Sequence, residues 1–196
     1  MNRAGKPQGR SSAMATRYRS ARGLTLIEVL VVVFILGLAG AMVIPTMGST
    51  GILRVQGAIR TLVADITFAQ SDAMAFQQAR AILFDQPNNS YRVVQVINGT
   101  VDAANTMYDG SREGKRMLVN LNSPDFGGAR MTSVNFGTGA AASLLVFDDL
   151  GTPVADPSGN TPSSGGRIRV QGQDSVHEII VEPYTGRISV RRISGG

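Results

Sequence analysis

Residues able to do chemistry are few in this sequence, and His177 is the only histidine. It lies in the alternating run 176–181, without the positioned nucleophile and orienting group that a catalytic base needs. Asp148 and Asp149 could supply oxygen ligands to Ca²⁺, but no further acidic residues follow at the spacing of a calcium-binding loop. The pattern favours a structural or surface histidine, a hairpin turn ending at Gly151, and no enzymatic activity.

Two other features could bind ligands, and both have simpler explanations. Arg187, Arg191 and Arg192 form a basic cluster, but no aromatic residues alternate with them as on a surface for single-stranded nucleic acid, so we expect a solvated face. The glycine-rich stretch 137–139 lacks the lysine and the following helix of a phosphate-binding loop. The chain has no cysteine, which excludes thiol catalysis, disulfides, cysteine-ligated zinc and a lipid-modified cysteine. We therefore predict no cofactor and no metal site.

The net charge of +5 is concentrated at the N-terminus. Residues 1–23 hold six of the 19 basic residues and no acidic residue, whereas the rest of the chain carries 13 basic and 14 acidic residues. If the first 23 residues are removed as a leader, the basic excess goes with them. The charge pattern therefore gives little support for nucleic acid as a partner.

A long apolar segment, 24–44, follows the basic stretch, and Glu28 is its single charged residue. As a helix it would be about 31 Å long, close to the ~30 Å of a bilayer hydrocarbon core. Basic residues that precede a span stay in the cytoplasm. We therefore expect one span of the inner membrane, with the N-terminus cytoplasmic and the remaining domain periplasmic.

A secretory signal peptide is the alternative, since residues 39–41 offer a small-residue cleavage site at the end of the apolar run. Cleavage after Ala41 would release an exported β-rich binding domain. Glu28 argues against this, because a carboxylate in an apolar run costs free energy in lipid and a signal peptide has no use for it. The sequence favours a retained helix and leaves the secreted alternative open. An exported hydrolase is not supported, because no nucleophile, base and acid are found together.

A second helix is predicted over 52–78, after a hinge at Pro45, Gly48 and Gly51. Its apolar residues recur at steps of three and four, which predicts one buried face. We expect this face to pack on a sheet of the same chain in preference to a coiled-coil partner. The apolar residues are Ile52, Val55, Ile59, Leu62, Ile66, Ala69, Ala73 and Phe76. The charged residues expected on the other faces are Arg54, Arg60, Asp65 and Asp72.

Short strand-like runs separated by turn residues fill 80–193. A hairpin turn is expected at 85–90 and a surface loop at 155–166. The predicted fold is α+β, a long N-terminal helix packed on a C-terminal antiparallel β-rich domain. Its parts are a cleaved leader, 1–23, a transmembrane helix and hinge, 24–51, and a periplasmic domain, 52–196. The expected strands are 81–84, 91–97, 116–121, 132–136, 144–147, 167–171, 176–181 and 187–193.

The junction Arg22-Gly23-Leu24 and the residues up to Leu30 resemble the class III signal of type IV pilins and type II secretion pseudopilins. The resemblance implies cleavage between Gly23 and Leu24 by a prepilin peptidase, methylation of the new amino group of Leu24, and a role in assembly for Glu28. Leu24 stands where phenylalanine is usual, which bears on the efficiency of cleavage. An internal start at Met14 would give a leader of ten residues.

Three later segments narrow the resemblance to minor subunits of the GspH/FimT type. Together with the N-terminal signal, these segments extend the resemblance over residues 24–193. It implies a pilin-like fold and a structural subunit near the tip of a pseudopilus or pilus. The implied partners are other pilin or pseudopilin subunits, the prepilin peptidase, the inner membrane and a secreted protein substrate. The resemblance does not distinguish a subunit of a secretion system from a subunit of a pilus or of a DNA-uptake system. The three segments are 62–73, 146–151 and 185–190.

Overall fold

The structure is a computed structural model that describes residues 23–43, 49–137, 142–159, 161–173 and 175–195. The chain divides into two compact units, Met1–Pro45 and Thr46–Gly196. Several features of the sequence analysis lie outside the described residues: the leader up to Arg22 with the internal start Met14, the hinge residues Pro45 and Gly48, and 138–139 of the glycine-rich stretch.

The described part of the first unit contains helix α1, Leu26–Val43. Thr25 precedes it, and the backbone N–H of Glu28 donates to the Thr25 hydroxyl at 3.3 Å and to its carbonyl oxygen at 3.1 Å. The first N–H groups of a helix have no partner within the helix, so a threonine hydroxyl at this position stabilises its start. Glu28 lies in the first turn, where a negative charge is favourable.

Within the described residues, no helix is long and apolar enough to cross a membrane. The predicted span, 24–44, ends at Ile44, which lies outside those residues. It stays a prediction.

The second unit begins with helix α2, Ser49–Phe76. It starts three residues before the predicted 52 and includes Gly51, which was expected in the hinge. It ends two residues before the predicted 78, because Gln77 has a φ of 49° and the N–H of Gln78 bonds to the carbonyl oxygen of Ala73 at 3.2 Å. A left-handed residue with this bond is a common way for a helix to end.

Most of the predicted apolar face of α2 is buried. Among the predicted residues with described side chains, which leaves out Ile52, two differ: Phe76 is 66% exposed in the last turn of the helix, and Asp65, expected on an outer face, is 3% exposed. Asp65 can be buried because its carboxylate has hydrogen-bonding partners from distant segments, as described below. The buried apolar residues of α2 are Val55, Ala58, Ile59, Leu62, Ile66, Ala69 and Ala73.

Ten antiparallel strands among the described residues form two sheets, so the predicted α+β class with a C-terminal antiparallel β-rich domain is confirmed. The first sheet has the order β3-β2-β1-β6-β7, with β4 also paired to β2, and the second has the order β10-β9-β8-β5. The strands are β1 Arg80–Asp85, β2 Ser90–Ile97, β3 Thr100–Thr106, β4 Leu118–Asn120, β5 Arg130–Asn135, β6 Leu144–Phe147, β7 Pro153–Val154, β8 Gly166–Gln171, β9 Ser175–Val181 and β10 Ile188–Gly195.

Two strands were not expected from the sequence. β3 has no run of apolar residues, because it lies at the edge of its sheet with most of its side chains exposed or half-buried. β7 is only two residues long and begins with Pro153. Neither strand has the alternation of apolar residues on which a sequence-based prediction depends.

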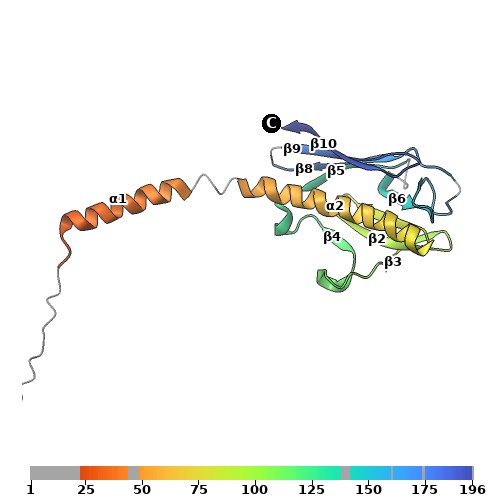
Figure 1. The fold of residues 1–196 in the computed structure, drawn as a ribbon, viewed down its shortest axis with the longest axis horizontal. Coiled ribbons are helices and arrows are strands. Elements are labelled where there is room, and N and C mark those ends of the chain that lie inside the picture. Colours follow the sequence, from red (N-terminus) through yellow and green to blue (C-terminus); the bar gives the residue numbers. More distant parts are fainter. Residues whose placement is uncertain (1–22, 44–48, 138–141, 160, 174, 196) are drawn as a thin grey trace, which may run out of the picture. The chain divides into compact units, whose positions relative to one another are not determined.

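One hydrophobic core joins α2 to both sheets. Its members come from the buried face of α2 and from strands of each sheet, among them Ile82 of β1, Phe147 of β6, Ile168 of β8 and Ile179 of β9. In the view of Figure 1, α2 runs between β8, β9 and β10 on one side and β2, β3 and β4 on the other. A second, smaller apolar cluster forms around Ala81, Val94, Val146 and Val154. The core therefore holds α2 in a fixed position relative to the turns of both sheets.

Candidate functional site

The predicted cleavage site lies in a short segment without regular structure. Residues 23–25 are exposed and precede α1, and Leu24 is 73% exposed. Exposed segments outside helices and strands are where proteolysis is favoured. The Gly23–Leu24 bond therefore lies in a conformation that a peptidase can reach.

Helix α1 is apolar on all sides, and Glu28 is its single ionisable residue. Its described side chains, up to residue 40, are exposed within the chain, and even Phe34, at 65%, has no covering group. A helix without a polar face belongs in a protein core or in lipid. Taken by itself, the first unit leaves the described side chains of α1 uncovered.

Glu28 has a local role that the sequence analysis missed. Thr25 and Glu28 have the spacing of a capping box, in which a threonine is followed three residues later by a glutamate. The structure contains one half of this motif, the bond from the Glu28 N–H to the Thr25 hydroxyl. The sequence pattern that indicates this capping box is Thr-x-x-Glu before an apolar run. Any role in assembly therefore adds to a contribution at the start of the helix.

The alternative cleavage site lies in a different environment. Residues 39–41 fall within α1, which continues to Val43. Cleavage after Ala41 would require the last turn of this helix to open, whereas cleavage after Gly23 would not. The geometry favours the earlier bond.

The three later segments of the resemblance meet at the side chain of Gln70. Its amide nitrogen donates to the carbonyl oxygen of Gly151 at 2.8 Å and to that of Thr185 at 3.1 Å. Gly151 has a φ of 77° and Gly186 a φ of 64°, which few other residues adopt at low cost. Segments more than 80 residues apart in the chain are thus joined by one side chain.

The family comparison supports the interpretation of the N-terminal segment. Residues 18–44 match the family model described as the prokaryotic N-terminal methylation motif. The chain is pilin-like at its N-terminus. The match includes Gly23, Leu24, Glu28 and the described part of α1.

A solved structure resembles this chain over a larger part of its length. It is the structure of the minor pseudopilin EpsH from the Type 2 Secretion System of Vibrio cholerae, with 12% sequence identity and a TM-score of 0.44. The comparison covers 72% of this chain and 97% of that one. These values are too low to carry the role of EpsH over to this chain. No curated relative matches the sequence.

The turn at Asp148 needs no metal ion to explain its acidic residues. One carboxylate oxygen of Asp148 accepts hydrogen bonds from the backbone N–H groups of Leu150, at 3.0 Å, and Thr152, at 2.7 Å. The N–H of Gly151 bonds to the carbonyl oxygen of Asp148 at 3.1 Å, which closes the turn. Asp149 is exposed. Across the part of the chain that the structure describes, no group of three or more potential ligands could hold a metal ion.

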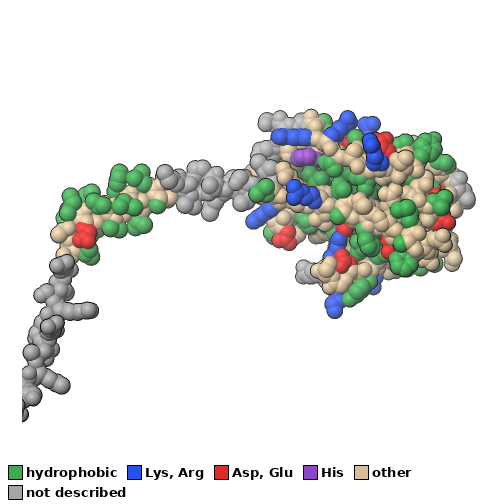
Figure 2. Space-filling model, in the orientation of Figure 1, with side chains coloured by type: hydrophobic (Ala, Val, Ile, Leu, Met, Phe, Trp, Pro, Cys, Tyr) green, Lys and Arg blue, Asp and Glu red, His purple; other side chains and the backbone are tan. Residues whose placement is uncertain are grey.

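His177 lies on β9, opposite Arg192 of β10 and Val170 of β8. Partial burial and the positive charge of Arg192 lower its pKa, so the imidazole is neutral at pH 7. Figure 2 shows Lys and Arg side chains on the same face as the single histidine. The Nδ1 atom of His177 is buried and has no hydrogen-bond partner among the described residues.

The basic cluster is not simply a solvated face, because Arg191 forms an ion pair. Glu178 of β9 is fully buried and accepts from the Nε of Arg191 at 2.9 Å and from the Nε of Arg169 at 3.0 Å. Burial alone would raise the pKa of Glu178, but the hydrogen bonds from the two guanidinium groups outweigh it and lower the pKa. The carboxylate therefore links β8, β9 and β10.

A buried polar network around Asp65 was not predicted. Its carboxylate accepts a hydrogen bond from the Tyr91 hydroxyl at 2.8 Å and one from Arg112 at 2.9 Å, and Arg112 also pairs with Asp109 at 2.7 Å. Burial, and then the charge of Asp65, raise the pKa of Tyr91, which keeps the phenol protonated. The partners are 26 and 47 residues away from Asp65 in sequence, so no local pattern reveals them.

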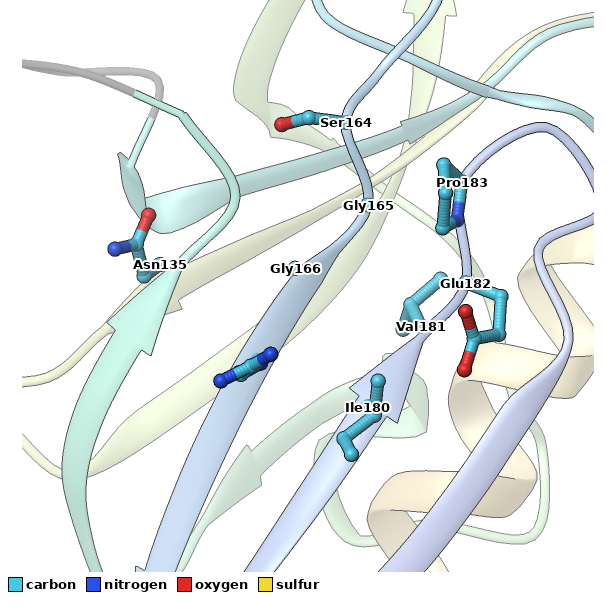
Figure 3. Close-up of a pocket in the computed structure, with 9 residues that line it drawn as sticks. Asn135, Ser164, Gly165, Gly166, Ile180, Val181, Glu182 and Pro183 are labelled. Atoms are coloured by element: carbon cyan, nitrogen blue, oxygen red, sulfur yellow. The ribbon is translucent and has the colours of Figure 1, made fainter.

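A hollow beside the ends of β5, β8 and β9 is shown in Figure 3. Gly165 and Gly166 form part of its lining, and a Cβ at Gly166 would lie 2.1 Å from the Phe136 ring. Arg167 and Glu182 are its charged lining residues, and no nucleophile–base pair lines it. These glycines let the backbone approach Phe136 and residues 181–183 closely.

Proposed function

We propose that this chain is a structural subunit of a type II secretion pseudopilus or a type IV pilus. The observation that carries the proposal is α1, an exposed helix that is apolar on all sides, has one carboxylate in its first turn and lies within the matched methylation motif. Such a helix needs lipid before assembly and the helices of other subunits after it.

Processing is proposed at the Gly23–Leu24 bond. A prepilin peptidase cuts this bond on the cytoplasmic side of the membrane and methylates the amino group of Leu24. The exposed, irregular conformation of 23–25 supports this assignment. The helical conformation of 39–41 counts against release by signal peptidase after Ala41.

In the proposed topology, the segment up to Gly23 lies in the cytoplasm, α1 enters the inner membrane and the second unit lies in the periplasm. The basic residues before Gly23 support this orientation. Glu28 then pairs with the terminal ammonium group of Leu24 in a neighbouring subunit. A carboxylate in an apolar environment gains most from such a pair, because an unpaired charge there is strongly disfavoured.

A position as a minor subunit near the filament tip is part of the proposal. The resemblance of 62–73, 146–151 and 185–190 to GspH/FimT-type subunits supports it, together with the meeting of these segments at Gln70. The expected partners are other pilin or pseudopilin subunits, with a secreted protein substrate as a further partner at the tip. No enzymatic activity is proposed.

The N-terminal residue of the mature protein tests the proposal. The protein is purified from membranes of cells that contain a prepilin peptidase, and its N-terminal peptide is identified by mass spectrometry. We expect N-methylated Leu24. A mature chain that begins at Met42 would refute the filament proposal and support an exported binding domain.

A further inference from the structure

A partly apolar groove lies between α2 and the second sheet. Ile59 and Val63 of α2 line one side, and Val190 of β10 and His177 of β9 line the other. Val190 is paired with the fully buried Ile179 of β9, so both point to the face of the sheet that α2 partly covers. Val190 itself remains 45% exposed. The groove is therefore a place where core packing is incomplete.

Strand β10 borders this groove and forms one edge of the second sheet. It pairs with β9, and no other strand among the described residues pairs with its outer edge. The backbone N–H and C=O groups of such an edge can accept another extended segment as an added strand. Alternate side chains of that segment would point toward the groove.

The charges around the groove are positive. Arg60 lines it, and Arg192 lies opposite His177 on the same face of β10. Among the described residues that line the groove, none is acidic. The nearest carboxylate on β9, Glu178, belongs to the opposite face, where it is occupied by Arg169 and Arg191. An occupant with carboxylates is therefore favoured by its charge.

The same charges disfavour a second copy of this chain as the occupant. Pairing two β10 strands would bring Arg191 and Arg192 of one copy near those of the other, and like charges on neighbouring strands are destabilising. Basic residues on an edge strand commonly prevent this kind of self-association.

We propose that the edge of β10 and the adjacent groove bind an extended, acidic segment of another protein. The segment adds to β10 as a strand, places apolar side chains against Ile59, Val63 and Val190, and directs carboxylates toward Arg60 and Arg192. This surface belongs to the second unit, so it does not depend on α1 or on the proposed place in a filament.

Fluorescence anisotropy with labelled ten-residue peptides tests the proposal. The full chain is held in nanodiscs of zwitterionic phosphatidylcholine, which adds no competing anionic surface. One peptide alternates valine with glutamate, and the other alternates valine with lysine. We expect saturable binding of the glutamate peptide and none of the lysine peptide. Exchange of the β10 backbone amides with solvent should slow when the glutamate peptide is bound.

Three variants locate the binding site. The double substitution Arg60→Glu and Arg192→Glu should weaken binding of the glutamate peptide about tenfold or more, because it reverses the charges beside the groove. Val190→Glu should weaken it to a similar degree. The matched control, Arg130→Glu with Arg167→Glu, makes the same charge change on the other face of the sheet and should leave the affinity within about twofold.

Four results would overturn the proposal. The first three are an absence of saturable binding of the glutamate peptide, equal binding of both peptides, and an equal loss of affinity in the matched control. The fourth is self-association through β10. Because the chain has no cysteine, an Ile193→Cys variant that forms a disulfide-linked dimer without peptide would reveal it.

Discussion

The side-chain amide of Gln70 lies 2.8 Å from the carbonyl oxygen of Gly151. The same nitrogen lies 3.1 Å from the carbonyl oxygen of Thr185. Gly151 belongs to the turn after β6 in the first sheet, and Thr185 to the turn between β9 and β10 in the second. One amide of α2 thus links a turn of each sheet to the helix.

Replacing Gln70 with leucine should therefore destabilise the second unit. The carbonyl oxygen of Gly151 would lose its donor in a partly buried environment, where an unsatisfied polar group costs about 1–3 kcal/mol, whereas the carbonyl oxygen of Thr185 is exposed and can bind water. Urea unfolding followed by circular dichroism measures the change. Gln56→Leu is the control, since Gln56 is exposed on the same helix and should change the unfolding free energy by less than about 0.5 kcal/mol. Equal effects of the two substitutions would contradict the role of Gln70.

Alanine at Gly151 or Gly186 should also be destabilising. Each glycine has a positive φ, and an added Cβ would lie 2.7 Å from Met74 at position 151 or 2.5 Å from the Gln70 amide at position 186. We expect a loss of about 1–3 kcal/mol at each site, from backbone strain and close contact together. Gly57→Ala is the matched control. Gly57 lies in α2 with open space around it, so alanine should stabilise by about 0.5–1 kcal/mol. Thermal unfolding of the three variants shows whether each substitution lowers or raises the stability.

Glu178 should make the stability depend on pH in the acidic range. Its pKa in the folded chain is lowered below its usual 4.5, so it contributes stability that is complete above pH 4.5 and is lost as the pH falls through the folded pKa. Glu178→Gln should cost about 1–2 kcal/mol at pH 7, because Arg169 and Arg191 are partly exposed and can be solvated. Urea unfolding of both proteins at pH 7, 5 and 3.5 measures this difference, which should shrink only below pH 4.5. A difference that grows on acidification would refute the assignment.

Valine at Gly23 should block maturation. A branched side chain at the residue before the proposed cleaved bond would obstruct the peptidase, and the precursor should accumulate in the membrane fraction. Immunoblotting of cells that contain the prepilin peptidase shows the two sizes. Ala41→Val is the control that separates the two cleavage sites, because it should leave processing after Gly23 unchanged. Normal maturation of Gly23→Val, or blocked maturation of Ala41→Val, would move the cleavage site away from Gly23.

Leucine at Glu28 should leave expression, cleavage and membrane insertion intact but reduce incorporation into the filament or its tip. A carboxylate near the start of an apolar helix hinders insertion, so its removal makes insertion no harder. Its loss also removes the partner of the neighbouring terminal ammonium group. Crosslinking to neighbouring subunits in intact cells measures incorporation, relative to wild type.

Glu28→Gln distinguishes the role of the negative charge from the role of the side chain in capping the helix, because glutamine can also complete a capping box. If the ion pair matters, this variant should incorporate as poorly as Glu28→Leu. If Glu28→Gln is crosslinked to neighbouring subunits as much as wild type, the ion pair is refuted and capping of the helix remains as the role of Glu28.

The sequence alone determined the features that depend on local patterns. The apolar run after Gly23 predicted α1, and steps of three and four predicted most of the buried face of α2, because a helix returns to the same face at that spacing. Alternating apolar residues predicted eight strands close to their observed bounds. β3 and β7 were missed because their residues do not alternate in this way.

Only the tertiary structure decided the features that depend on residues far apart in the chain. Asp65 is buried because Tyr91 and Arg112 supply hydrogen bonds from 26 and 47 residues away, and an aspartate in a helix otherwise indicates a solvated face. In the sequence, Gln70 does not differ from other polar residues of the helix. Its role is visible only in the structure, where the turns at Gly151 and Thr185 lie beside it. Hydrogen bonds of this kind leave no periodic trace in a sequence, because the fold alone brings their partners within 3 Å or so of one another.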